Sequence, residues 1–111
     1  MIEQSDLVRH LQTRFIQRGI PEPVYEYQFN WERRFRFDIA WLTWKLAVEC
    51  HGATWTGGAH VTGGGFERNR RKMNLAIEQG WRVLEYTTSM IASDEAIDQI
   101  ERIIRATGAM T

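Results

Sequence analysis

The sequence predicts a single domain of the α/β (α+β) class, with helices and strands in the order α, β, β, β, α, β, α. The chain has 111 residues, about the length of one domain. Hydrophobic residues make up 43% of it, which is enough for a folded core. Apolar residues recur with helical spacing in some segments and with strand alternation in others. We therefore expect residues 1–111 to fold as one unit.

Composition narrows the function classes. The 14 basic and 14 acidic residues balance, so net charge gives no indication of a nucleic-acid partner. The single cysteine, Cys50, cannot form an internal disulfide, which favours a reducing compartment. No apolar run approaches the ~20 residues that span a bilayer, and the N-terminus lacks a signal-peptide pattern. We expect a cytoplasmic protein with no membrane partner.

Helices are predicted near both ends of the chain. Ser5 is a candidate N-cap for the first helix, and Gly19 is expected to follow its last turn. The apolar residues of this helix are Leu7, Val8, Leu11 and Phe15. Ser93 is the candidate cap of the last helix, whose acidic first turn and basic last turns suit the helix dipole. Its apolar stripe is Ile97, Ile100, Ile103 and Ile104.

Four apolar or aromatic runs predict strands. They are "VYEYQFN" (24–30), "RFRFDIAW" (34–41), "KLAVEC" (45–50) and "WRVLEYT" (81–87). The second and third runs are separated by so few residues that they should form a hairpin around 42–45.

Glycine dominates the segment after the third strand. Residues 52–65 contain six glycines and no periodicity, which predicts a long flexible loop. A helix is expected from Phe66 to about Gly80, where a glycine favours termination. The residues expected on its core-facing side are Phe66, Met73, Ala76 and Ile77.

Two carboxylates interrupt the apolar hairpin. If the turn is centred between Thr43 and Trp44, Asp38 lies opposite Glu49, with their Cβ atoms roughly 4.5–5.5 Å apart. His51 would point to the same side as Glu49. Two carboxylates so close repel each other, and a hard divalent ion such as Mg²⁺ relieves that repulsion. The pair is therefore a candidate metal site, and the alternative is a solvated face with arginine or lysine partners.

The segment "FERNRRK" (66–72) gathers four cations near the expected helix start, where the dipole disfavours them. Basic groups beside exposed backbone N–H groups suit phosphate oxygens, and the preceding glycines would let a nucleic-acid backbone approach. The alternative is a solvated face paired with Glu67 and Glu78. In the glycine-rich loop, His60 could shuttle protons and Trp55 could stack on a base. The alternative is that both side chains have a structural role, as part of a loop that covers the core.

Four blocks in order, "FRFDIAW", "KLAVECHGATW", "GGAHVTGGGFERNRRKMN" and "GWRVLEYT", resemble the PD-(D/E)XK nuclease superfamily. The closer resemblance is to small phage and bacterial endonuclease-like proteins related to the very-short-patch repair enzymes. It covers roughly residues 21–90. It implies a restriction-endonuclease-like αβββαβ core, in which a central four-stranded mixed sheet is flanked by helices.

The resemblance also implies a site. Asp38 and Glu49 match the acidic metal ligands of the family. The family's Glu-x-Lys is Glu49-Cys50-His51 here, so the motif lysine is missing, and Lys72 matches a lysine on the following helix. The candidate catalytic residues are therefore Asp38, Glu49, His51, His60 and Lys72, and the candidate DNA contacts are Trp55, Arg68, Arg70 and Arg71. On the first helix, Asp6 or Glu3 is a candidate match for a further acidic residue.

The expected function is Mg²⁺-dependent endonuclease activity on DNA, with Mn²⁺ as a substitute ion, in the cytoplasm of a bacterial or phage-infected cell. The preferred substrate, whether linear duplex, mismatch, nick or junction, stays open. Two alternatives remain. One is a nucleic-acid-binding module that has lost cleavage, which the missing motif lysine suggests. The other is a partner-dependent nuclease subunit or homodimer, which the small size of the chain suggests.

Overall fold

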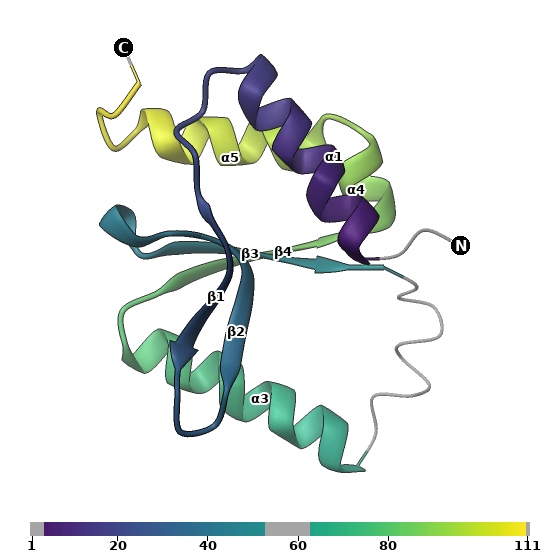
Figure 1. Ribbon diagram of the computed structural model, residues 1–111, viewed down its shortest axis with the longest axis vertical. Coiled ribbons are helices and arrows are strands. Elements are labelled where there is room, and N and C mark those ends of the chain that lie inside the picture. The colour runs from purple at the N-terminus through teal and green to yellow at the C-terminus, as the bar shows by residue number, and fades with distance from the viewer. Residues whose placement is uncertain (1–3, 53–62, 111) are drawn as a thin grey trace.

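The computed structural model describes residues 4–52 and 63–110, and the helices and strands follow the predicted order with two short additions (Figure 1). The elements are α1 (Gln4–Gln17), β1 (Val24–Asn30), β2 (Phe35–Trp41), the 3-10 turn η1 (Leu42–Trp44), β3 (Leu46–His51), α3 (Gly63–Glu78), β4 (Arg82–Thr87), α4 (Thr88–Ala92) and α5 (Glu95–Arg105). The additions are η1 and α4. None of the helices in the described part of the chain has the length and apolar character needed to cross a membrane.

The four strands form one sheet in the order β1-β2-β3-β4. Strand β2 runs antiparallel to both β1 and β3, whereas β3 and β4 are parallel. A parallel pair needs a crossover connection, and the chain between β3 and β4 contains α3. The coarse prediction of a mixed four-stranded sheet flanked by helices is therefore confirmed.

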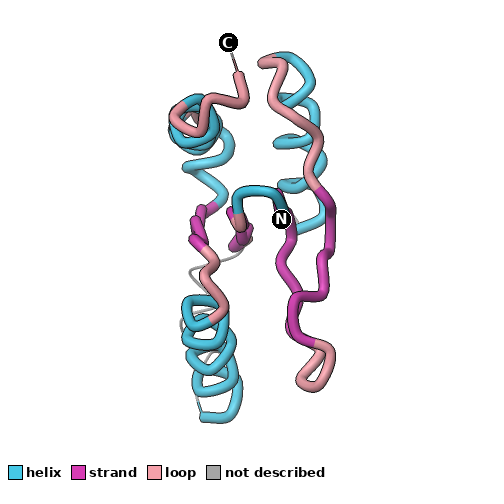
Figure 2. Tube along the Cα trace, turned by 90° about the vertical axis from the view of Figure 1, so that its left-hand side faces the viewer, coloured by secondary structure: helices cyan, strands magenta, loops and turns pink. Residues whose placement is uncertain are grey.

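Helices cover both faces of the sheet, and they do so unequally (Figures 1 and 2). Helices α1, α4 and α5 pack on one face over a large apolar core that includes Leu11, Phe15, Val48 and Ile100. On the other face lies α3, whose fully buried side chain Ala76 joins Phe37, Ala40, Ala47 and Trp81. Because strand side chains alternate between faces, β2 and β3 contribute to both clusters.

The β2–β3 hairpin has the predicted register. Ile39 pairs with Val48 and Trp41 with Leu46, which centres the turn between Thr43 and Trp44. Lys45 adopts a left-handed conformation with φ 47° and donates its backbone N–H to the carbonyl of Leu42. This compact turn fixes which residues of the two strands face each other.

The prediction for the first helix is right in its apolar stripe and wrong at its cap. Leu7, Leu11 and Phe15 are buried, and the helix ends two residues before Gly19, which has φ +66°. Ser5 lies inside α1 and is exposed, so it is not the N-cap. Ser is tolerated there because its side chain points to solvent.

The third helix begins earlier than predicted. Gly63 is its first residue, so the expected loop 52–65 loses its last three glycines to α3. The expected core-facing side is also wrong, because Phe66 is 50% exposed and Ile77 is 67% exposed. Only Ala76 of that set is fully buried. The sheet face beneath α3 is small, so the helix contacts it along a narrow strip.

The C-terminal region contains the unpredicted helix α4, and Asp94 rather than Ser93 occupies the N-cap position of α5. The hydroxyl of Ser93 still accepts a hydrogen bond from the backbone N–H of Glu95 at 3.3 Å. The predicted apolar stripe of α5 is confirmed, because Ile97, Ile100 and Ile104 are buried and Ile103 packs against the same core.

Candidate active site at the open end of the hairpin

Asp38 and Glu49 meet where the ladder between β2 and β3 ends, one position beyond the pair Ile39 and Val48. Each carboxylate accepts a hydrogen bond from the backbone of the opposite strand. The N–H of Asp38 donates to Glu49 Oε2 at 2.9 Å. The N–H of Cys50 donates to Asp38 Oδ2 at 2.7 Å. These reciprocal bonds fix both carboxylates at a point where the strands no longer bond to each other directly.

Glu49 is the buried member of the pair, with 6% of its surface exposed. Burial raises the pKa of its carboxyl group, and the nearby charge of Asp38 raises it further, whereas Lys72 lowers it. Burial and the same two carboxylates also raise the pKa of the Cys50 thiol to about 12. Cys50 therefore stays protonated, and its side chain lies in the core on the face opposite to Glu49.

Lys72 reaches this pair from α3. Its ammonium group forms an ion pair with Glu49 Oε1, and only 15% of its side chain is exposed. The ammonium also lies 5.9 Å from the centre of the Phe37 ring, so its stem runs along the aromatic surface of β2. The helix thus supplies a cation to the carboxylates although the residue two positions after Glu49 is a histidine.

The first helix contributes an amide rather than a carboxylate. Gln4 Nε2 donates to Asp38 Oδ1 at 2.6 Å. Asp6 forms an ion pair with Arg9 on its own helix instead, and Glu3 lies outside the described residues. Sequence reasoning missed Gln4, although it precedes Leu7 and Leu11 on the same helix face and so points toward the sheet.

His51 extends the site along β3 toward β4. Its Nε2 lies 3.0 Å from Glu85 Oε1. Glu49 and Glu85 are register partners on the parallel strands β3 and β4, so both carboxylates lie on the α3 face. Glu85 was also missed, because the sequence gives no indication of which residue of β4 pairs with Glu49.

The cations of α3 lie in its middle turns. The sequence predicted that these cations would lie at the helix N-terminus, where the helix dipole disfavours positive charge. Because α3 spans Gly63–Glu78, Arg68 lies five residues past its first residue, and the predicted conflict does not arise. Arg68 Nη2 donates to the carbonyl of Arg33 at 3.1 Å, and its guanidinium lies 4.7 Å from the centre of the Phe35 ring. Arg71 pairs with Glu67 at 2.8 Å. Arg70 covers Phe66 at 5.1 Å.

Two predicted site residues, Trp55 and His60, lie outside the described residues. The structure therefore brings Asp38, Glu49 and Lys72 together, whereas His51 contacts Glu85 on the neighbouring strand. The remaining predicted contacts form an exposed basic surface on α3.

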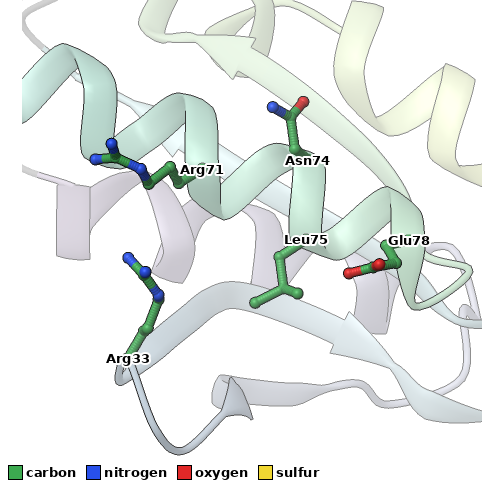
Figure 3. Close-up of a pocket in the computed structure, with 5 residues that line it drawn as sticks. All are labelled: Arg33, Arg71, Asn74, Leu75 and Glu78. Carbon is green, nitrogen blue, oxygen red and sulfur yellow. The ribbon is translucent and has the colours of Figure 1, made fainter.

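An open depression of about 400 Å³ adjoins that surface, between α3 and the β1–β2 turn (Figure 3). Its lining residues are Arg33, Arg71, Asn74, Leu75 and Glu78. Figure 3 shows the Arg33 side chain extending from the turn toward the helix, where Arg71 lies. The depression is not part of the carboxylate site, because Asp38, Glu49 and Lys72 are not among its lining residues. It is a neighbour of that site, since Arg71 directly precedes Lys72 in α3.

The donor set fits a partly hydrated divalent ion. Within residues 4–52 and 63–110, no three His, Cys, Asp or Glu side chains gather closely enough to enclose a metal. Mg²⁺, however, usually binds one or two protein carboxylates and keeps several waters. Each oxygen of Asp38 and Glu49 accepts one hydrogen bond from the protein, and a carboxylate oxygen has a second lone pair available.

Comparisons with protein-family models, with curated proteins and with solved structures give no match to this chain.

Proposed function

We propose that this protein is a Mg²⁺-dependent endonuclease that hydrolyses phosphodiester bonds in DNA, in the cytoplasm of a bacterial or phage-infected cell. The observation that supports this most is the buried carboxylate of Glu49, which lies beside Asp38 and is paired with Lys72. Two carboxylates and a lysine are not needed at this point for the stability of the sheet, because replacing buried ions by apolar groups is often neutral or stabilising.

In this proposal Asp38 and Glu49 would hold the ion, which would supply Lewis-acid chemistry by polarising the scissile phosphate and lowering the pKa of water. Lys72 stabilises the negative charge that develops on the phosphate, since its ammonium has little contact with solvent. His51 accepts or donates a proton, and Glu85 orients its ring through the 3.0 Å contact. Gln4 keeps the Asp38 carboxylate in place by its hydrogen bond.

The arginines of α3 bind the flanking DNA backbone. Arg68, Arg70 and Arg71 are exposed and lie on the same helix as Lys72. Guanidinium groups recognise phosphates by paired hydrogen bonds. By binding the phosphates on either side, the three arginines would orient the scissile bond over Asp38 and Glu49.

A second candidate function is DNA binding without cleavage. Lys72 and three other donors of the protein already occupy the four carboxylate oxygens. If these bonds persist on DNA and no ion binds at the second lone pairs, the pair has no role beyond holding the strands. A homodimer is compatible with either function, and a partner-dependent nuclease subunit is compatible with the first.

Incubation with supercoiled plasmid tests the proposal. We expect nicking with Mg²⁺ or Mn²⁺ and none with EDTA. Asp38→Asn should stop nicking and still fold, because an asparagine oxygen can accept the Cys50 N–H and Gln4 can rotate to face the new amide. Arg102→Ala, which changes an exposed residue of α5, is the matched control and should nick normally. DNA binding without nicking under every condition would favour the second candidate.

A further inference from the structure

The β1–β2 turn, residues 31–34, holds an aromatic side chain outward. Trp31 is 78% exposed, the largest fraction among the large apolar residues of the described chain. The turn around it is ordered by a hydrogen bond of 2.8 Å from the Arg33 N–H to Asn30 Oδ1. Arg34 adopts a left-handed conformation with φ 59°. A tryptophan held outward in this way offers a large apolar ring and a polar N–H to a partner.

This turn is joined to α3. Both views of the fold put it at the same end of the molecule as that helix (Figures 1 and 2). Arg68 connects them, because it donates to the Arg33 carbonyl and packs on the Phe35 ring. Arg33 and Arg71 then line the depression between the turn and the helix (Figure 3).

The surface formed by the β1–β2 turn and the first half of α3 is strongly basic, although the chain as a whole is neutral. Residues 31–34 contain two arginines and residues 66–72 contain four cations, so these 11 positions hold six of the 14 basic residues. The same positions hold two acidic residues, Glu32 and Glu67. A local excess of positive charge with an exposed aromatic ring matches the chemistry of a nucleic acid, which offers phosphates and base faces.

The surface is continuous with the carboxylate site. Arg68 and Lys72 are four residues apart on α3, about 6 Å along the helix. Beneath them, Arg68 contacts Phe35 and Lys72 approaches Phe37 on β2. Arg68, which contacts the turn, therefore lies about one helical turn from Lys72, so the two surfaces adjoin along α3.

We propose that the β1–β2 turn is a second DNA contact that selects substrates with unpaired bases near the scissile bond. Arg33 and Arg71 bind a phosphate, and Trp31 stacks on a base that has left the duplex. In a fully paired duplex each base is already stacked on its neighbours, so Trp31 has no free base face to cover. The position of the turn relative to cleavage depends on the proposed nuclease function, whereas the binding preference does not.

Binding measured in EDTA tests the turn separately from cleavage. The probes are two labelled DNA oligonucleotides of equal length, a duplex with a short unpaired bulge and the same duplex fully paired. Trp31→Ala should weaken binding of the bulged DNA by ~10-fold and change binding of the paired DNA by less than twofold. Arg33→Ala should weaken both and reduce the log–log salt slope by about one.

Matched controls come from the opposite side of the sheet. Ile16→Ala removes an apolar side chain that is 76% exposed on α1, and Arg102→Ala removes an exposed cation of α5. Both should bind like the unmodified protein. The proposal is overturned if Trp31→Ala leaves bulged-DNA binding unchanged, as it would if the turn contacted an acidic protein, or if it weakens both probes equally.

The two proposals can fail independently. If neither the unmodified protein nor any variant nicks plasmid, but Trp31→Ala still weakens binding of the bulged DNA, the nuclease is rejected and the turn is kept as a DNA contact. Normal nicking by Trp31→Ala on a bulged substrate, with unchanged affinity, would reject the turn and keep the nuclease.

Discussion

Helices α1, α4 and α5 cover one face of the sheet over fifteen buried residues, whereas on the α3 face the described residues include a cluster of five. The first face is almost entirely apolar inside, and its ion pairs lie at the rim, where Arg18 contacts Asp98 and Glu101. On the second face, the ion pair of Lys72 and Glu49 is itself largely buried.

The difference separates stability from function. Apolar burial supplies most of the free energy of folding, so the larger core can maintain the fold. The smaller face can then accept a buried carboxylate with a raised pKa and a row of exposed arginines. We therefore expect mutations on the larger face to lower the free energy of unfolding, and mutations on the α3 face to lower the cleavage rate or the affinity for DNA.

The largest effect is expected for cleavage when the carboxylates change. Glu49→Gln should reduce the cleavage rate at least ~10²-fold, because it removes a candidate ligand and a charge at the reacting centre. Glu49→Gln also leaves Lys72 without its partner, but burial already raises the pKa of Glu49 and so disfavours its charge, and stability should therefore fall less than in a variant that removes Lys72. Single-turnover cleavage and urea unfolding measure the two quantities. Full activity in this variant would contradict the role of the site.

Lys72→Met should affect both cleavage and stability. The variant leaves Glu49 buried beside Asp38 without its cation, and breaking a largely buried pair costs about 3 kcal/mol in the free energy of unfolding. The double variant with Glu49→Gln should recover most of that loss, because no unpaired charge remains. Affinity for DNA should change little in Lys72→Met. A stability loss in the double variant as large as in the single one would contradict the coupling.

A mutation in the larger core should affect stability alone. Leu11→Ala removes a fully buried side chain beneath α1 and should lower the free energy of unfolding by about 3 kcal/mol. Ile77→Ala on α3, where the side chain is 67% exposed, should change it by less than ~0.5 kcal/mol. Urea unfolding measures both. Equal effects would mean that the two helices bury their apolar residues alike, contrary to the comparison.

The smallest effect concerns pH at the rim of the larger core. Hydrogen bonds from Arg18 and Arg105 hold the pKa of Glu101 below its ordinary value of 4.5. The unfolded chain therefore takes up this proton first, and the stabilisation present above pH 4.5 is lost as the pH falls below it. Glu101→Gln should be less stable than the unmodified protein at pH 7, with a difference that shrinks at lower pH. A constant difference would show that Glu101 does not titrate in this way.

Local patterns predicted much of the fold because they depend on neighbouring residues. Helical spacing identified the buried stripe of α5, and the turn at residues 42–45 fixed the register of Asp38 against Glu49. The same spacing failed on α3, because Phe66, Met73 and Ile77 resemble an apolar face. Ala76 and Lys72 face the sheet instead, since the narrow surface of Phe37, Ala40 and Ala47 admits a small residue and a flexible stem.

The sequence by itself determined the order of the main elements and the two carboxylates on facing strands, because alternation and turn length act over a few residues. Only the tertiary structure decided that Gln4 bonds to Asp38, that Glu85 lies beside His51, and that Arg68 ties α3 to the β1–β2 turn. These contacts join residues 34 or 35 positions apart. Which such residues meet depends on how helices and strands pack and pair, and no local pattern encodes it.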